Sequence, residues 1–298
     1  MKDHFVQIDV PIDRYNGLTV DLRKLPEEDL KQTEWCDEKF ENNLVDSLNR
    51  WIQDGRRSVW FMVPSELTRF IPVLIRNKFE FHHTELNLCV LTRWIKDDEP
   101  NRLPKFAHTT IGIGGIVYHP IKEKVLLIQE KNSPVKMWKF PGGYSEPNEN
   151  FSATAIREVF EETGILCDYV SMISFRHDHR KVLGCSNIYF VCLLVPQKLD
   201  EISMNSIEKC QFEIDDCCWF DLPEARSLLL GFNRFVMEKF LQQYSLLEFS
   251  NLNVDRLEKQ QHSYTIRTEL IHTKYGPHER DEQVYFVHQS DLSFLNNC

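Results

Sequence analysis

Hydrophobic and polar positions divide the chain into segments of two kinds. Apolar residues at every second position, or in short runs, predict strands, because successive side chains of a strand point to opposite faces. In the first third of the chain such segments lie at residues 5–10, 18–22, 58–63, 79–81 and 86–95. Apolar residues three and four positions apart predict helices from residue 33 to Gly55 and over residues 65–75. Pro72 lies inside the second helix, and we expect it to cause a kink.

A second set of segments follows a charged break at residues 97–101, which contains a proline. Here the pattern predicts strands at residues 107–117, 124–130, 169–176, 188–195 and 211–220, and helices at residues 150–163, 223–230 and 232–244. Residues 176–181 are dense in cationic side chains, and we expect a loop there. Further on, alternating segments on both sides of a Gly-Pro pair at residues 276–277 indicate a β-hairpin.

The order of these segments predicts an α+β protein with two domains. We place an N-terminal α+β domain at residues 1–98 and a second domain at residues 106–247, in which strands surround one charged helix. Residues 248–298 are assigned to a C-terminal tail. The 298 residues, with 42% hydrophobic content, supply enough apolar side chains for two ordinary cores.

Composition narrows the classes of function. The formal net charge of −10 argues against general binding to nucleic acids, whose protein partners are usually basic. The nine cysteines include no C-x-x-C pair, which argues against a structural zinc site. They fit a reducing compartment, and we expect a cytoplasmic protein, with a nuclear or mitochondrial location left open. The longest apolar run, residues 188–195, is too short to cross a bilayer, so no membrane association is expected.

Candidate chemistry is concentrated in one helix and the glycine turn before it. Glu158, Glu161 and Glu162 have the spacing that places side chains on one face of a helix. Three carboxylates on one face repel one another, and Gly143 precedes them in a turn. We therefore expect this face to bind a hard cation, Mg²⁺ or Mn²⁺, because both ions prefer oxygen ligands.

The same stretch carries a longer motif, G-x5-E-x7-R-E-U-x-E-E-x-G-U, in which U is an aliphatic residue. Its positions are filled by Gly143, Glu149, Arg157, Glu158, Val159, Glu161, Glu162, Gly164 and Ile165. The motif resembles the Nudix box, and on it the chain is identified as a member of the Nudix hydrolase family. The resemblance implies an α/β/α sandwich for the second domain, metal-dependent hydrolysis of a phosphoanhydride, and the Gly143 carbonyl as a further metal ligand.

The catalytic candidates lie within this motif. We expect Glu161 and Glu162 to act both as catalytic residues and, with Glu158, as metal ligands. Arg157 and Glu149 are also catalytic candidates, and an ion pair between them is expected to hold the entering loop against the helix. The general base stays open, because several Nudix enzymes carry it in a later loop. The candidates for it are Glu161, Glu162, Glu208 and Glu213.

Residues outside the motif are expected to contact the substrate. The candidates are Lys139, Phe140, Arg176, His177 and His179. Cationic side chains neutralise phosphate charge, and an aromatic ring can stack on a base. Glycines at positions 112, 114 and 115 in an expected strand indicate close approach of backbone or ligand. His82 and His83 are adjacent in an expected strand, so we expect them to point to opposite faces.

Motifs spread over residues 5–245 resemble one Nudix subgroup, which includes the vertebrate fibroblast-growth-factor antisense gene product and plant ADP-ribose/NADH pyrophosphatases. They include residues 13–17, 79–83, 107–108, 129–130, 138–143 and 175–179. The resemblance implies an acyltransferase-like N-terminal domain that contributes to homodimer formation or substrate capture. It also implies ADP-ribose or NADH as the substrate.

The sequence thus predicts a metal-dependent pyrophosphohydrolase that acts on a small nucleoside diphosphate linked to another moiety. The expected products are a nucleoside monophosphate and the phosphorylated moiety. Two alternatives remain. One is an RNA 5′-cap hydrolase, and the other is a regulatory binding protein that has lost catalysis. The intact motif argues against the second alternative.

Overall fold

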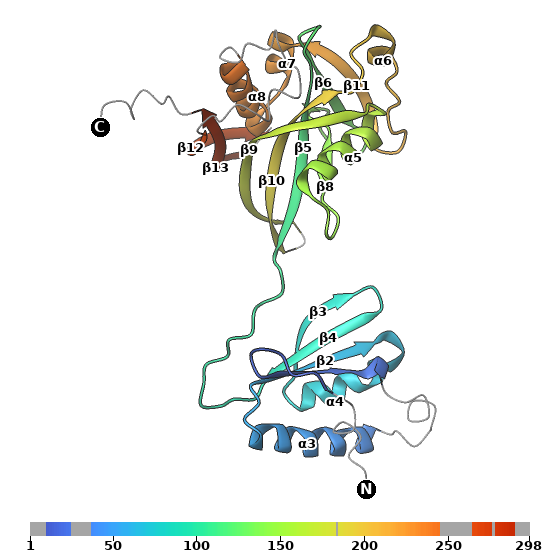
Figure 1. Ribbon diagram of the computed structural model, residues 1–298, viewed down its shortest axis with the longest axis vertical. Helices are drawn as coiled ribbons and strands as arrows, with labels where there is room; N and C mark the ends of the chain where they lie inside the picture. The colour runs from blue at the N-terminus through green and yellow to red at the C-terminus, as the bar shows by residue number, and fades with distance from the viewer. Residues whose placement is uncertain (1–9, 25–36, 183, 245–263, 276–277, 290–298) are drawn as a thin grey trace, which may run out of the picture. The chain divides into compact units, whose positions relative to one another are not determined.

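A computed structural model describes most of the chain. The described residues are 10–24, 37–182, 184–244, 264–275 and 278–289. The chain divides into two compact units, residues 1–107 and 108–298 (Figure 1). The strand expected at residues 5–10 and the beginning of the helix expected from residue 33 lie largely outside the described residues. In the part of the chain that is described, no helix is long and apolar enough to cross a membrane.

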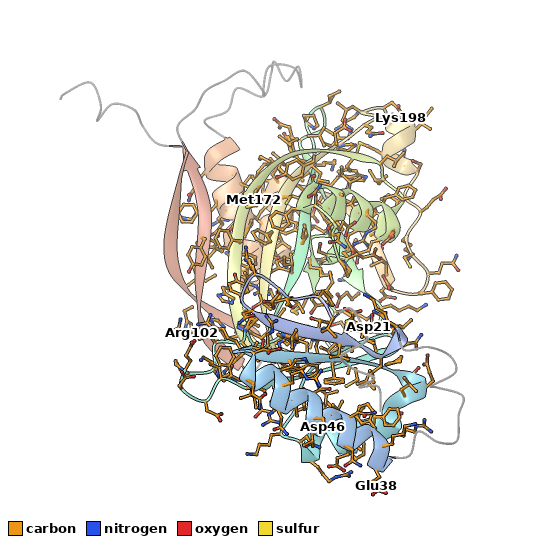
Figure 2. All side chains as sticks on the ribbon, turned by 60° about the horizontal axis from the view of Figure 1, so that its bottom comes forward. Asp21, Glu38, Asp46, Arg102, Met172 and Lys198 are labelled. Carbon is orange, nitrogen blue, oxygen red and sulfur yellow. The ribbon has the colours of Figure 1, made fainter. Side chains whose placement is uncertain are left out.

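The first unit is a four-stranded sheet covered by helices. In sheet order its strands are β1 (Gly17–Asp21), β2 (Ser58–Pro64), β4 (Leu88–Trp94) and β3 (Glu80–Glu85). Its helices are α3 (Asp37–Gln53), α4 (Ile71–Arg76) and the short 3₁₀ segments Leu22–Lys24 and Ser65–Phe70. Phe40 of α3, Phe61 of β2 and Phe70 are fully buried in one core. Glu38 and Asp46 of α3, which are labelled in Figure 2, are exposed.

Pro72 does not kink a continuous helix, contrary to the expectation. The segment before it is a 3₁₀ helix that ends at Phe70, and α4 begins at Ile71, so Pro72 lies in the first turn of α4. The first N–H groups of a helix have no acceptor within the helix, so proline is tolerated there. The apolar period across residues 65–75 therefore spans two short helices.

His82 and His83 turn toward each other, although strand alternation predicts opposite faces. A bulge between Phe81 and His83, in the pairing of β3 with β4, interrupts the alternation. The two Nδ1 atoms are 2.7 Å apart, and His82 Nε2 lies 2.9 Å from the carbonyl oxygen of Pro104. The ring of His83 also stacks on Phe106. The pair therefore connects β3 with the segment that follows the charged break.

The second unit is built on a nine-stranded sheet. Its main path is β11 (Ile214–Asp221), β6 (Lys124–Glu130), β5 (Thr109–His119), β10 (Cys185–Pro196), β9 (Cys167–Val182), β13 (His278–Gln289) and β12 (Tyr264–Tyr275). Two short strands, β7 (Trp138–Lys139) and β8 (Gly142–Tyr144), pair with β6 and β5. The helices are α5 (Phe151–Thr163), α6 (Glu201–Asn205), α7 (Leu222–Leu228) and α8 (Gly231–Tyr244).

Helices cover both faces of this sheet, with α5 on one side and α7 and α8 on the other (Figure 1). Successive residues of β5 serve the two cores in turn. Val117 packs in the core of α5, whereas Ile116 and Tyr118 pack in the core of α8. A strand that is buried on both faces needs apolar residues at consecutive positions, which explains the apolar run of β6. The second unit is thus the mixed α/β sandwich that was expected.

Residues 176–181, for which a loop is expected, belong to β9 instead. This strand pairs with β10 along most of its length and with β13 at Ser174, Phe175 and Arg176. The pairing with β10 continues into this segment at Arg176, His177 and Asp178, and a local density of charge carries no information about such a partner. The strands β12 and β13 form an antiparallel hairpin, which joins the sheet through β9.

Candidate active site

Helix α5 is fixed by its apolar side and by a glycine at its end. Ala155 and Val159 are buried against the sheet. The backbone before the helix is extended at Asn150. Gly164 ends the helix with a φ of 74°, the left-handed conformation that favours glycine. The helix therefore has one defined rotation, and its acidic residues have a defined place.

A cavity of about 900 Å³ lies beside α5 in the second unit. The helix lines it with Arg157, Glu158, Glu161 and Glu162, which we call the helix wall. Strands β5, β7, β9 and β10 line it with Gly112, Lys139, Arg176 and Tyr189, which we call the sheet wall. Gly142 and Gly143 of β8 also line the cavity. Acidic groups and cationic groups thus line the same cavity.

Arg157 joins three carboxylates of the motif. Its Nε donates to Glu149 Oε1 at 2.8 Å, and its Nη1 donates to Glu158 Oε1 at 2.8 Å and to Glu161 Oε2 at 2.9 Å. Its Nη2 donates to the Tyr144 carbonyl at 3.1 Å. The hydrogen bond from the guanidinium lowers the pKa of Glu149 to about 2. The ion pair expected between Arg157 and Glu149 is present, and it ties the turn to the helix.

Glu162 is the most enclosed carboxylate of the helix wall, with 6% of its surface exposed. Its Oε2 accepts a hydrogen bond from the Gly142 N–H at 2.6 Å. Burial raises the pKa of Glu162 to about 7, against the opposing effects of the Lys139 ammonium and the Gly142 N–H. Lys139 also pairs with Glu130. The helix wall and the sheet wall therefore interact through the charges of Glu162 and Lys139.

The oxygen donors of this region fit a hard divalent cation. Glu158, Glu161 and Glu162 supply carboxylates, and all three line the same cavity. A side chain at Gly143 would overlap the Glu158 carboxylate, so glycine lets the backbone approach the acidic residues. Within the described residues no three His, Cys, Asp or Glu side chains are already grouped as metal ligands. Arg157 donates hydrogen bonds to two of these carboxylates, and a bound cation would replace some of these hydrogen bonds.

Of the five residues expected to contact the substrate, two line the cavity and three lie elsewhere. Lys139 and Arg176 line the cavity. Phe140 does not, because it is fully buried in the core of α8 and leaves no ring surface for a ligand. His177 and His179 are exposed and pack against each other, with ring centroids 4.1 Å apart. Alternation along β9 directs them to the side away from Arg176, so they are absent from the cavity lining.

The candidates for a general base separate in the same way. Glu213, just before β11, lines the cavity together with Glu161 and Glu162. Glu208, which follows α6 in the chain, packs against the last residue of α5. Its N–H donates to the Thr163 carbonyl at 2.9 Å, and it does not line the cavity. The geometry thus leaves three of the four carboxylates within reach of a ligand in the cavity.

Several residues of the cavity were not among the predicted site residues, including Gly112, Glu130, Asp178 and Tyr189. They come from β5, β6, β9 and β10, and only the sheet brings them together. The glycines of β5 are the one available hint, since glycine in a strand indicates close approach of another group. In the structure that group is the Tyr189 ring, which covers Gly112 and Gly114.

Comparisons with known proteins show the family of this chain. A family model described as a NUDIX domain matches residues 108–244, and a model described as a Nudix hydrolase domain matches residues 9–95. The chain is 35% identical over 221 residues to nucleoside diphosphate-linked moiety X motif 6 of Xenopus laevis, a match that covers 67% of this chain and 99% of that protein. The chain therefore belongs to the Nudix hydrolase family.

Two further similarities each cover less than two thirds of one of the two chains compared. The human protein of the same name is 37% identical over 215 residues, which cover 72% of this chain and 65% of that protein. The matched region thus spans less than two thirds of the human relative. The solved structure of a NUDIX hydrolase from Nitrosomonas europaea has a TM-score of 0.38 and 19% identity, and covers 47% of this chain and 96% of that chain.

Proposed function

We propose that this protein is a divalent-metal-dependent pyrophosphohydrolase of nucleoside diphosphates linked to another moiety. ADP-ribose or NADH is the proposed substrate, and Mg²⁺ or Mn²⁺ the proposed metal. The observation that carries the proposal is the single cavity in which three carboxylates of α5 face the same space as Lys139 and Arg176. The name of the human and frog relatives, which refers to a moiety linked to a nucleoside diphosphate, supports this substrate class.

The residues of the cavity divide the work of phosphoanhydride cleavage. A bound divalent cation would neutralise phosphate charge and activate water. Glu158, Glu161 and Glu162 would hold it, with the Gly143 carbonyl as the further ligand. Arg157 and Glu149 fix the rotation of the helix and the turn, and so set where these oxygens lie.

The sheet wall supplies the complementary charge. Lys139 and Arg176 would bind phosphoryl oxygens, because charge-assisted hydrogen bonds to phosphate are the stronger kind. One carboxylate that lines the cavity would accept the proton of the attacking water. The candidates that remain in the cavity are Glu161, Glu162 and Glu213. Cleavage would yield a nucleoside monophosphate and the phosphorylated moiety.

The N-terminal unit is assigned a supporting role. We propose that it is the acyltransferase-like domain implied by the sequence resemblance, and that it contributes to homodimer formation or substrate capture. Its own sheet and helices share one core, which supports an independent domain. The proposed location is cytoplasmic.

A hydrolysis panel tests the proposal. The purified chain is incubated with ADP-ribose, NADH, NAD, FAD, coenzyme A, nucleoside triphosphates and capped RNA, with and without Mg²⁺ or Mn²⁺. Chromatography should show metal-dependent release of AMP from ADP-ribose or NADH. Activity on capped RNA alone would replace the proposed substrate by an RNA 5′ cap. Absence of turnover across the panel would contradict the proposal and favour a regulatory binding protein.

A further inference from the structure

Tyr189 occupies a position in the cavity that the motif does not account for. It lies on β10 between two neighbouring strands, paired with Gly112 of β5 and with Arg176 of β9. A methyl group added to Gly112 would lie 2.7 Å from Tyr189 Cδ2, and one added to Gly114 would overlap the Tyr189 hydroxyl. Because neither glycine has a side chain, the phenol ring lies directly on the sheet over Gly112 and Gly114. We call these two residues the glycine seat.

The hydroxyl group of this ring has cationic neighbours. The Arg176 guanidinium lies 5.6 Å from the centroid of the Tyr189 ring, and Lys139 lines the same cavity. Burial raises the pKa of Tyr189, so the phenol keeps its proton at neutral pH. A tyrosine that only fills a core usually satisfies its hydroxyl within the fold. Within the described residues the Tyr189 hydroxyl has no hydrogen bond, and the residue lines the cavity.

We propose that the Tyr189 hydroxyl donates a hydrogen bond to a phosphoryl oxygen of the diphosphate, beside Lys139 and Arg176. Its partner is thus an anionic phosphoryl group, which a neutral phenol and two cations recognise together. This inference rests on the proposed function, because it names a contact of the same substrate in the same cavity. It assigns the glycines of β5 a functional reason, since they set the height of the hydroxyl above the sheet.

Removal of the hydroxyl is the first test. A hydrogen bond to a charged group contributes enough that Tyr189→Phe should raise KM for ADP-ribose about tenfold, with a smaller change in kcat. Tyr169→Phe is the matched control, because Tyr169 lies in β9, packs in the core of α5 and does not line the cavity. Both variants should keep a melting temperature close to that of the wild type. An unchanged KM in a folded Tyr189→Phe protein would overturn the inference.

A double-mutant cycle tests the role of the glycine seat. Gly114→Ala should displace the hydroxyl and raise KM to a similar extent as Tyr189→Phe. In the Tyr189→Phe background the added methyl meets no hydroxyl, and ring Cζ at 3.0 Å can move by a few tenths of an ångström. Gly114→Ala should therefore add little to KM in that background. Independent, multiplying effects of the two substitutions would contradict a shared mechanism.

Direct binding separates this inference from the proposed hydrolysis. Calorimetry with the methylene-bridged analogue of adenosine diphosphate, in the presence of Mg²⁺, measures affinity without turnover. The Kd should rise about tenfold in Tyr189→Phe and stay unchanged in Tyr169→Phe. If the wild type hydrolyses no substrate of the panel but shows this difference, the proposed reaction fails and the phosphoryl contact stands. Equal affinity of wild type and Tyr189→Phe, or no affinity in either protein, would overturn the contact.

Discussion

The two walls of the cavity differ in how the chain builds them. The helix wall comes from residues 157–162, one short stretch on one helix, and it is acidic except for Arg157. The sheet wall comes from four strands that span residues 112–189, and it carries the cations Lys139 and Arg176, with the carboxylates of Glu130 and Asp178 lining the cavity beside them. The contrast indicates a division of labour. In the proposed mechanism the helix supplies oxygen ligands for a cation, and the sheet supplies donors for the anion that accompanies it.

Metal removal should have the largest effect, because the helix wall alone presents three carboxylates to an anionic substrate. Treatment with a chelator should abolish hydrolysis of ADP-ribose, and added Mn²⁺ or Mg²⁺ should restore it. The measurement is AMP release against free metal concentration. Hydrolysis that persists in the presence of the chelator would contradict the metal-binding role proposed for the helix wall.

Glu162→Gln tests the helix wall by a single substitution. The change keeps the shape of the side chain and removes its charge from the most enclosed carboxylate. We expect kcat for ADP-ribose to fall by at least about 100-fold. Glu224→Gln, on the exposed surface of α7, controls for the loss of one negative charge. If Glu162→Gln turned over at the rate of the wild type, the role assigned to the helix would be wrong.

The sheet wall is tested by neighbouring residues of β9. Arg176→Met should raise KM for ADP-ribose roughly tenfold or more, because it removes a charge-assisted donor from the cavity. His177→Gln should have a clearly smaller effect, since alternation along β9 directs His177 away from the cavity. Steady-state kinetics of both variants give the comparison. A larger effect at His177 would support the sequence expectation against the geometry.

The smallest expected effect is on how the free energy of unfolding depends on pH. The pKa of Glu149 is about 2 in the folded protein and 4.5 as its ordinary value, so its contribution is present above about pH 4.5 and is lost as the pH falls toward 2. Because solvent screens the pair with Arg157, we expect about 1 kcal/mol. Urea unfolding at pH 6 and pH 3 should show a smaller loss of stability in Glu149→Gln than in the wild type. Parallel losses in both proteins would count against this contribution.

Sequence spacing predicts the helix wall well for a physical reason. The helix repeat converts positions 158, 161 and 162 into one face, so the arrangement is local and needs no partner. The same holds for Gly164, whose left-handed backbone ends the helix at the position that the glycine indicates. Alternating apolar positions likewise predict most strands of both sheets, because side-chain direction alternates within each strand.

The sequence names Lys139 and Arg176 of the sheet wall as candidates, but it does not bring them together with Tyr189, because that depends on which strands become neighbours. Tyr189 meets Gly112 and Arg176 only through the order of β5, β10 and β9. The cationic segment at residues 176–181 was expected to be a loop, since spacing shows its charge but not its partners. Phe140 shows the same limit, because an aromatic residue beside a glycine turn can face a ligand or a core, and only packing decides.

The central claim is that the helix wall binds a divalent cation, and manganese binding tests it most directly. Electron paramagnetic resonance of free Mn²⁺, recorded during a titration, measures this binding without any substrate. The account predicts saturable binding by the wild type, and an affinity at least about tenfold lower when Glu158, Glu161 and Glu162 are all replaced by glutamine. Equal Mn²⁺ affinity of the two folded proteins would contradict the claim.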